Sequence, residues 1–375
     1  PSKSRGLGDV YKRQLMSRVK CLILGASGLV GQRLQQRLFS HPMFEIGAVA
    51  GSLNTAGKSL RSIPWRLSEP RPDLPELEIL NANSEELVNH CHELDISIAF
   101  SGLPSKSAMT IEKHLTDSGI TVFSNASAYR RTVGIPMVIP EINAHHLHSS
   151  MHYCATNCTL IPLAIPVSII DSMTNIKSIT MRSEQALSGA GWELLYDEAA
   201  LSGDVNPEID GEAEKTRAEL LYVLGTVESL EITPLELDVS VVCQRISRPD
   251  GHQVFVEIET SDMLTDDELI DAMQSAICFN HLPSGPNNTI HLVEEIEPLT
   301  HLWSDGTEFS VNPDPATNLK AGMAIVLGNI SVNEHKISFS AYSHNTIRGA
   351  AGGLVYLAEL VLSLIHISEP TRLAW

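Results

Sequence analysis

The strongest constraint on this chain is a short apolar run that leads directly into closely spaced glycines. Residues 19–24 (VKCLIL) have the composition of a buried strand, and residues 25–31 (GASGLVG) follow without a break. Leu34, Leu38 and Phe39 then recur on one side of a helical pattern. Strand, glycine turn and helix together predict a dinucleotide site, because glycines admit the pyrophosphate close to the backbone and the helix N-terminus attracts its charge.

The glycine spacing is G-x-x-G-x-x-G, which meets the G-x-G-x-x-G fingerprint only in part. An ordinary strand-to-helix turn is therefore the alternative, but the flanking strand and helix patterns favour cofactor binding. The residues that we expect to contact the cofactor at this turn are Gly25, Ser27, Gly28, Leu29 and Val30.

The loop after the next predicted strand, residues 44–50, bears on the choice of cofactor. No acidic residue follows this strand to bind the ribose of NAD. Ser52, Thr55 and Lys58 are found there instead, and each taken singly could be a solvated loop residue. Together they suit the 2′-phosphate of NADP, so we expect NADP in preference to NAD.

Composition narrows the class of protein. The formal net charge is −19 and Lys and Arg form no cluster, so we expect no nucleic-acid partner. Six cysteines in 375 residues do not make a disulfide scaffold, which indicates a reducing, cytoplasmic compartment. We find no apolar run of about 20 residues to span a membrane, and residues 1–14 lack the apolar core of a signal peptide. Residues 1–15 and 363–375 resemble non-native tails.

A thiol at the predicted start of a buried helix is the leading candidate nucleophile. Cys158 lies in the run 156–159 (TNCT), just before the apolar residues 160–170. The positive end of a helix dipole and the unpaired N–H groups there favour the reactive thiolate over the thiol. The alternative is an ordinary buried cysteine, since free cysteine is among the most buried residue types.

Histidines are frequent just before this cysteine, at positions 145, 146, 148 and 152. His148 and His152 are four residues apart and could share a helix face. No carboxylate or thiolate completes a metal site of known spacing, so we expect no metal and interpret these histidines as solvated or packing residues.

Charged residues elsewhere are candidates for an anion site. Arg130 and Arg131 are either surface charges or an anion clamp. Residues 206–224 are helical in pattern, and Glu212 and Lys215, three residues apart, share a face of that helix. The alternative for that pair is a solvent-exposed contact within the helix.

A predicted hairpin supplies a candidate base. Residues 237–242 read as a strand, and Asp250-Gly251 separates this region from another alternating run. Such a turn signal predicts a hairpin that would bring Arg245 close to His252. A lone histidine is more often structural, but a histidine that opens a strand beside an arginine is a candidate general base.

The motifs taken together resemble aspartate-β-semialdehyde dehydrogenases, most closely the archaeal and fungal branch. They occur in family order from about residue 19 to residue 359, and no single motif is specific. The motifs are 25–33 (GASGLVGQR), 41–45 (HPMFE), 101–105 (SGLPS), 124–127 (SNAS) with Arg130, 140–143 (PEIN), 157–159 (NCT), Gln185 with 188–191 (SGAG), 211–215 (GEAEK), 250–252 (DGH) and 343–352 (SHNTIRGAAG).

The resemblance implies a fold and a role for each site residue. The fold is α/β, with an N-terminal Rossmann-type parallel-sheet domain over residues 16–156 and an α+β catalytic and dimerisation domain over 157–344. A C-terminal helix over 345–362 returns to the first domain. The resemblance implies that Cys158, preceded by Asn157, is the nucleophile, that His252 is the general acid/base and that Gln185 orients the acyl group. It implies that Arg245 binds the substrate carboxylate, Glu212 its ammonium group, and Arg130 and Lys215 the phosphate. Ser188, Gly189 and Asn345 would contact the cofactor.

The implied reaction is the NADPH-dependent reductive dephosphorylation of L-aspartyl-4-phosphate to L-aspartate-4-semialdehyde through a thioacyl-enzyme. This step serves the biosynthesis of lysine, threonine, methionine and isoleucine. The family also implies a small-molecule substrate and a homodimer or homotetramer. Two alternatives stay open: an acyl-CoA reductase of the malonyl-CoA type with the same architecture, and a non-catalytic Rossmann protein that senses its cofactor.

Overall fold

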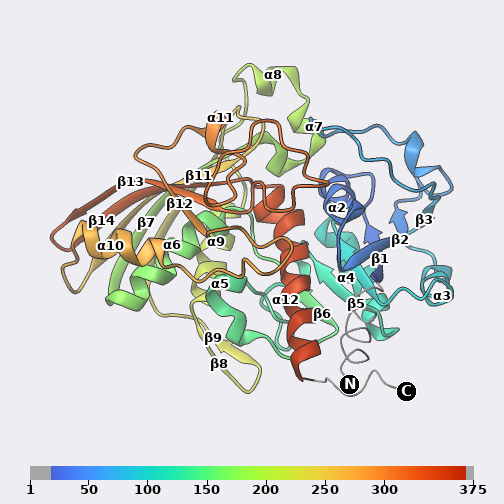
Figure 1. Ribbon diagram of the computed structural model, residues 1–375, viewed down its shortest axis with the longest axis horizontal. Helices are drawn as coiled ribbons and strands as arrows, with labels where there is room; N and C mark the ends of the chain where they lie inside the picture. The colour runs from blue at the N-terminus through green and yellow to red at the C-terminus, as the bar shows by residue number, and fades with distance from the viewer. Residues whose placement is uncertain (1–17, 369–375) are drawn as a thin grey trace, which may run out of the picture.

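The computed structural model describes residues 18–368, so the predicted tail 1–15 lies outside the described residues. These residues form two six-stranded sheets side by side, and the last helix runs between them (Figure 1). That helix ends at Ser368, beyond the end predicted near residue 362.

The first sheet is parallel throughout, with strand order β3-β2-β1-β4-β5-β6. Its strands are β1 (Val19–Leu24), β2 (Phe44–Gly51), β3 (Ile79–Asn81), β4 (Ile98–Ser101), β5 (Thr121–Ser124) and β6 (His152–Cys154). The helices of this region are α2 (Leu29–Phe39), α3 (Glu86–Glu93), α4 (Ser105–Asp117) and α5 (Pro140–Asn143), with 3-10 turns at Leu60–Ser62, Ser127–Tyr129 and Ala144–His146. This is the doubly wound order of dinucleotide-binding folds, so the predicted Rossmann-type sheet is confirmed.

The second sheet is mixed, with strand order β10-β7-β11-β14-β13-β12. Its strands are β7 (Ile176–Gln185), β10 (Asp238–Arg245), β11 (His252–Thr260), β12 (Ile290–Leu292), β13 (Ile325–Asn333) and β14 (Lys336–Ser343), and a separate pair is β8 (Thr226–Glu228) with β9 (Glu231–Thr233). The helices are α6 (Leu160–Met173), α7 (Trp192–Leu195), α8 (Glu198–Leu201), α9 (Glu212–Val223), α10 (Asp266–Gln274) and α11 (Pro298–His301), with a 3-10 turn at Leu187–Ala190.

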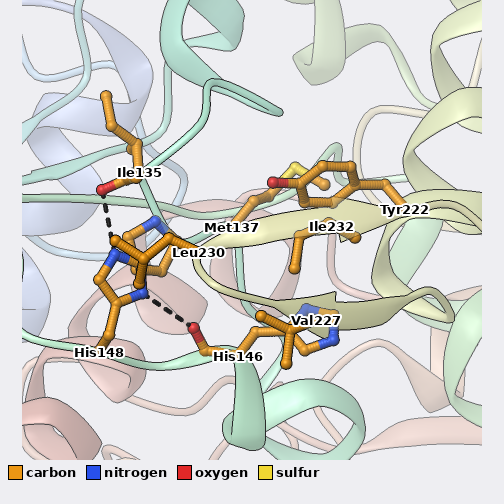
Figure 2. A pocket seen from close by; sticks show the side chains of 10 residues that line it. Ile135, Met137, His146, His148, Tyr222, Val227, Leu230 and Ile232 are labelled. Carbon is orange, nitrogen blue, oxygen red and sulfur yellow. Dashed lines mark hydrogen bonds between the residues drawn. The ribbon is translucent and has the colours of Figure 1, made fainter.

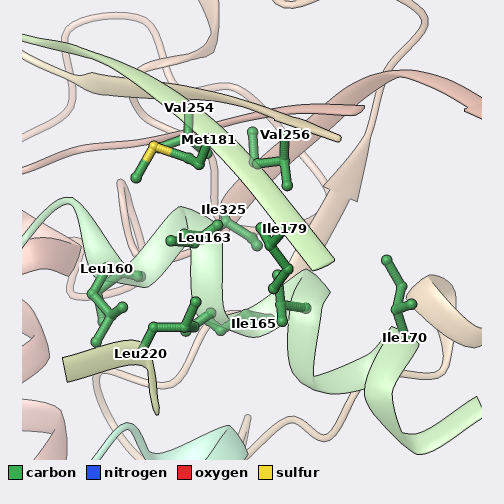
Figure 3. Close-up of a cluster of buried hydrophobic side chains, with 14 of the residues drawn as sticks. Leu160, Leu163, Ile165, Ile170, Ile179, Met181, Leu220, Val254, Val256 and Ile325 are labelled. Carbon is green, nitrogen blue, oxygen red and sulfur yellow. The ribbon is translucent and has the colours of Figure 1, made fainter. Parts of the chain in front are cut away.

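Helix α6 forms because nearly all of its residues are apolar and can be buried on every side. Leu163 and Ile165 lie against Ile179 of β7 and Val256 of β11 in the largest buried cluster (Figure 3). Burial of side chains of this size stabilises the fold by roughly 1.5–3 kcal/mol each. Helix α6 is thereby held against the second sheet. Cys158 lies just before the first turn of this helix.

The predicted hairpin at Asp250-Gly251 is wrong. Strand β10 pairs in parallel with β7, and β7 pairs antiparallel with β11, so β7 lies between the two predicted partners. An Asp-Gly signal reports a local reversal only, whereas the pairing partner follows from which strand buries its apolar face. The predicted helix over 206–224 begins later, at Glu212, because Gly211 is left-handed with a φ of 66°.

The end of the chain returns to the first sheet as predicted. A π-helical turn (Ile347–Ala351) leads into α12 (Gly352–Ser368). Leu354, Val355 and Ala358 pack with Ile23 and Phe100 of the first sheet. Within residues 18–368, the segment Ile347–Leu364 is the one helix long and apolar enough to cross a membrane, and 78% of it is buried inside the structure, as the core helix of a folded domain would be.

A buried ion pair joins this last segment to the middle of the chain. Arg348 donates to Glu141 at 2.6 Å, and both side chains are almost fully enclosed. We expect Glu141→Ala to lower the free energy of unfolding by about 3–5 kcal/mol, because it leaves the guanidinium buried without its counterion. Urea denaturation measures this change. The control is Lys113→Ala, which breaks the exposed pair with Asp117 and should leave the midpoint nearly unchanged; a wild-type midpoint for Glu141→Ala would contradict the prediction.

Candidate active site

A pocket of about 280 Å³ opens where the carboxyl edge of the first sheet meets the second. It collects side chains from both halves of the chain. The predicted site residues that line it are Val30, Arg130, Asn157, Cys158, Ser188, Gly189, Glu212, Lys215 and Asn345. We call this the Cys158 pocket.

Cys158 is held by its neighbours on both sides. Asn157 accepts the N–H of Thr159 through its side-chain oxygen at 2.8 Å, and α6 begins at the next residue, Leu160. On the other side, a Cβ added to Gly349 would lie 2.7 Å from the Cβ of Cys158. Only glycine fits at 349 without displacing the cysteine, so the turn before α12 forms one wall of the nucleophile.

In the protein without bound ligands, burial outweighs the effect expected of the helix start on the pKa of Cys158. Burial raises the pKa of Cys158 to about 11, and the nearby carboxylate of Glu212 raises it further, while Arg130 and Arg245 lower it. The reason is that a buried thiolate loses its hydration, which destabilises the charged form more than one helix start stabilises it. Cys158 is therefore a thiol at neutral pH.

His252 lies directly behind Gly189, because a Cβ on Gly189 would come within 3.0 Å of the His252 Nε2. Its Nδ1 accepts the N–H of Ala186 at 3.1 Å, and its buried Nε2 has no hydrogen-bond partner within residues 18–368. Burial, followed by the charges of Arg245 and Arg248, lowers the pKa of His252 to about 3. The ring is thus neutral, with its proton on Nε2.

Helix α9 presents a charged face to the pocket. Lys215 Nζ donates to Glu212 at 2.8 Å, and Asn157 Nδ2 donates to the other oxygen of Glu212 at 2.7 Å. Burial would raise the pKa of Glu212, but the hydrogen bonds from Lys215 and Asn157 lower it overall. Glu212 is therefore ionised, and Lys215 is the more exposed partner of the pair at the pocket wall.

Sequence reasoning missed Glu219, which lies one further step along the same helix face. It accepts from Arg130 Nη1 at 2.9 Å and from the backbone N–H of Asn157 at 2.7 Å. The signal was present, since positions 212, 215 and 219 recur at helical spacing. Without the fold, however, its partners in other segments could not be named.

Gln185 and Arg245 end adjacent strands and are paired in register, β7 to β10. Neither is among the residues that line the Cys158 pocket. Gln185 donates to Ser183 Oγ at 3.4 Å, and Arg245 Nη1 donates to the carbonyl of Ala186 at 2.7 Å. Gly189 covers Arg245, because a Cβ there would lie 2.9 Å from Nη1. Both side chains thus lie one layer behind the pocket surface.

The glycine turn fits a dinucleotide. Gly25 has a φ of 77°, and a Cβ on Gly31 would lie 2.1 Å from the Gly25 carbonyl oxygen, so the turn closes against the first turn of α2. Helix α2 begins after Gly28 with no side-chain cap, which leaves its first N–H groups to a ligand such as pyrophosphate. Ser52 and Thr55 follow β2, the strand beside β1, and Thr55 donates to the Ser52 carbonyl.

Asn345 lines the same pocket, and its side chain also joins two other segments by hydrogen bonds. Its side-chain oxygen accepts the N–H of Gly251 and its amide donates to Ser188, each at 2.8 Å. It therefore ties the residue before His252 to the loop over the pocket, and both halves of its amide are engaged.

The histidines of residues 145–152 divide between two places in the fold. No group of three or more His, Cys, Asp or Glu side chains within the described residues could hold a metal. His152 lies on β6 and pairs with Glu112, so it shares no helix with His148. His146 and His148 border a small cavity under the β8–β9 pair, where His148 contacts the carbonyls of His146 and Gly134 (Figure 2).

The raised pKa of Cys158 has a direct consequence for alkylation. The iodoacetamide reaction needs the thiolate, so its rate at Cys158 should rise about tenfold per pH unit from pH 7 to pH 10. The sign follows because raising the pH towards a raised pKa increases the thiolate fraction. Peptide mass spectrometry of labelled Cys158 measures this rate. A plateau below pH 9 would show that the thiolate is stabilised after all.

Comparisons with known proteins identify the family of this chain. The family described as semialdehyde dehydrogenase, NAD binding domain, matches residues 20–150. The aspartate-semialdehyde dehydrogenase of Archaeoglobus fulgidus is 31% identical over 91% of this chain and 97% of its own length. That of Saccharomyces cerevisiae is 27% identical over 91% and 97%.

A solved structure shares the whole architecture. The aspartate-semialdehyde dehydrogenase with NADP from Candida albicans superposes with a TM-score of 0.74 at 26% identity, over 92% of this chain and 98% of that one. The fold predicted by the resemblance is confirmed, and the protein is an oxidoreductase that uses a nicotinamide cofactor on a small-molecule substrate. The chain belongs to the aspartate-semialdehyde dehydrogenase family.

Proposed function

We propose that this enzyme reduces L-aspartyl-4-phosphate to L-aspartate-4-semialdehyde with NADPH, through a thioester on Cys158. The observation that carries the proposal is the Cys158 pocket itself, where one thiol faces two cations, Arg130 and Lys215, and one carboxylate, Glu212. Such a pocket suits a substrate with a phosphate at one end and an ammonium group at the other. The product would enter the synthesis of lysine, threonine, methionine and isoleucine.

The first step is acyl transfer. The sulfur of Cys158 attacks the acyl carbon, a C–S bond forms, and the bond from that carbon to the phosphate oxygen breaks. Arg130 and Lys215 neutralise the departing phosphate, which makes it a good leaving group. Because the thiol has a high pKa, its proton has to leave as the C–S bond forms, and the phosphate is the nearest group that gains basicity in that step.

The second step is reduction of the thioester. When bound, the nicotinamide supplies the hydride. Negative charge then develops on the acyl oxygen, and the Nε2 proton of His252 is available to meet it, since Nδ1 is already occupied by the Ala186 N–H. The carbonyl then re-forms as the C–S bond breaks, and the expelled thiolate takes one proton from solvent, which is the proton that the overall reduction consumes. A general acid/base in this place contributes about 10²–10⁴-fold.

Behind the surface of the pocket, Arg245 is our proposed ligand for the substrate carboxylate and Gln185 for the acyl group. Arg245 requires a shift of the Gly189 loop to reach a substrate, because Gly189 lies directly against its guanidinium. Asn157 keeps its proposed role beside the nucleophile, and Ser188, Gly189 and Asn345 keep theirs at the nicotinamide end.

We place the chain in the cytoplasm as a homodimer or homotetramer that assembles through the domain of residues 157–344. The first domain would comprise residues 16–156 and the helix over 345–362. The outward face of the second sheet supports this assembly, because Thr180, Glu257 and Lys336 lie exposed on neighbouring strands while the helices cover the opposite face.

The acyl-CoA reductase alternative keeps Cys158 and changes the donor. Glu212 argues against it, because a donor without an ammonium group gives no reason for an ionised carboxylate in the pocket. A protein that only senses its cofactor would need neither the thiol nor the cations.

One experiment tests the proposal against both alternatives. Aspartate semialdehyde should be oxidised with NADP⁺ in the presence of phosphate, and CoA in its place should give a lower rate. Cys158→Ser should lower kcat by roughly 10³-fold or more, since it removes the nucleophile. Cys278→Ser, a part-buried free cysteine, is the matched control and should retain activity. A faster CoA-dependent reaction, or an active Cys158→Ser, would reject the mechanism.

Cofactor choice gives a separate prediction. If Ser52 and Thr55 bind the 2′-phosphate, kcat/KM for NADPH should exceed that for NADH by about ten- to a hundredfold, the worth of a charge-assisted hydrogen bond. Steady-state kinetics with both cofactors measures the ratio. Equal values would mean that the loop after β2 contributes nothing to the choice.

A further inference from the structure

We propose that Glu219 is a positioning residue, which sets the phosphate-binding arginine and the nucleophile relative to each other. The inference rests on the proposed function of the Cys158 pocket. It concerns a residue that itself lies outside the pocket lining and that no motif singled out.

The geometry is specific to a bridging carboxylate. Each oxygen of Glu219 serves a different segment: Oε1 accepts from Arg130 Nη1 at 2.9 Å, and Oε2 accepts from the backbone N–H of Asn157 at 2.7 Å. Its side chain is 1% exposed. A charge-assisted bond of this kind is about twice as strong as a neutral one, so one buried group clamps the residue before Cys158 to the arginine across the pocket.

The remaining contacts of Asn157 explain why this backbone bond matters. Its amide donates to Glu212 and its side-chain oxygen accepts from Thr159. Helix α9 thus holds the side chain of Asn157 through Glu212 and Thr216, and its backbone through Glu219 alone. Without the bond to Glu219, α9 would hold only the side chain of Asn157, and the backbone that carries Cys158 would be free to shift.

The same carboxylate aims Arg130. A second nitrogen of this guanidinium, Nη2, donates to the Asn125 carbonyl at 2.8 Å, and the buried Nε has no partner within the described residues. The guanidinium is therefore held through Nη1 and Nη2, while its Nε–H remains available to donate to a ligand. An incoming phosphate meets an arginine that is already oriented and whose charge is balanced.

A purely electrostatic role and a positioning role for Glu219 predict opposite changes in the phosphate KM of Glu219→Gln. If Glu219 acted only through its charge, removing it would leave Arg130 more attractive to phosphate, and the phosphate KM would fall. If Glu219 acts by position, the substitution removes one of its two acceptors. The single oxygen of glutamine can accept from only one of the two donors, Arg130 or the backbone N–H of Asn157, and its NH₂ group then faces the remaining donor. The phosphate KM should then rise by about ten- to a hundredfold.

The test is steady-state oxidation of aspartate semialdehyde by the full chain with phosphate varied. For Glu219→Gln we expect the raised phosphate KM, a lower kcat, and a KM for the cofactor within twofold of wild type. The matched control is Glu214→Gln, an exposed carboxylate on the same helix that pairs with Arg217, and it should behave as wild type. A phosphate KM that falls or stays unchanged would overturn the proposal, as would a uniform rise in every KM together with a lower melting temperature.

A second readout does not depend on turnover. Phosphate should slow the alkylation of Cys158 in the wild type, and Glu219→Gln should need about ten times more phosphate for the same protection; equal protection would overturn the proposal. If Glu219→Gln does not fold, Glu219→Asp keeps the charge but shortens the reach, and a wild-type phosphate KM for it would be equally damaging. Wild-type enzyme with no phosphate-dependent turnover would instead refute the proposed function.

Discussion

The site depends on the immobility of Asn157. This residue is bonded through its backbone N–H, its amide and its side-chain oxygen, to two carboxylates of α9 and to the start of α6. The packing that buries α6 beneath the second sheet and the polar bonds that hold α9 therefore meet at one residue, next to the sulfur. Apolar burial stabilises the fold around α6, and the buried hydrogen bonds of Asn157 fix the orientation of the segment that carries Cys158.

Much of the first sheet and its helices could be predicted, because their patterns are local. The strand over 19–24 and the glycine turn follow from apolar runs and small residues, and the parallel order follows from alternating strands and helices. The second sheet was predicted less well. Asp250-Gly251 marks a reversal, but β7 comes from much earlier in the chain and lies between the supposed partners, which no local signal reports.

The candidate site shows the same division. Motif order identified Cys158, Arg130, Lys215 and Glu212, and they do line one pocket. The protonation state of the thiol could not be predicted, because it depends on how many atoms of distant segments exclude water from the sulfur. Glu219 could not be assigned for a related reason: its partners lie 62 and 89 residues away in the chain.

The contact between Gly349 and Cys158 also orders events during synthesis of the chain. The thiol is made before the turn that walls it, and this turn belongs to the last helix of the described chain. A nascent polypeptide that already contains both sheets still has an open cysteine, exposed to oxidants and to other thiols. The wall of the pocket beside the sulfur is thus completed last, when the carboxyl-terminal segment docks.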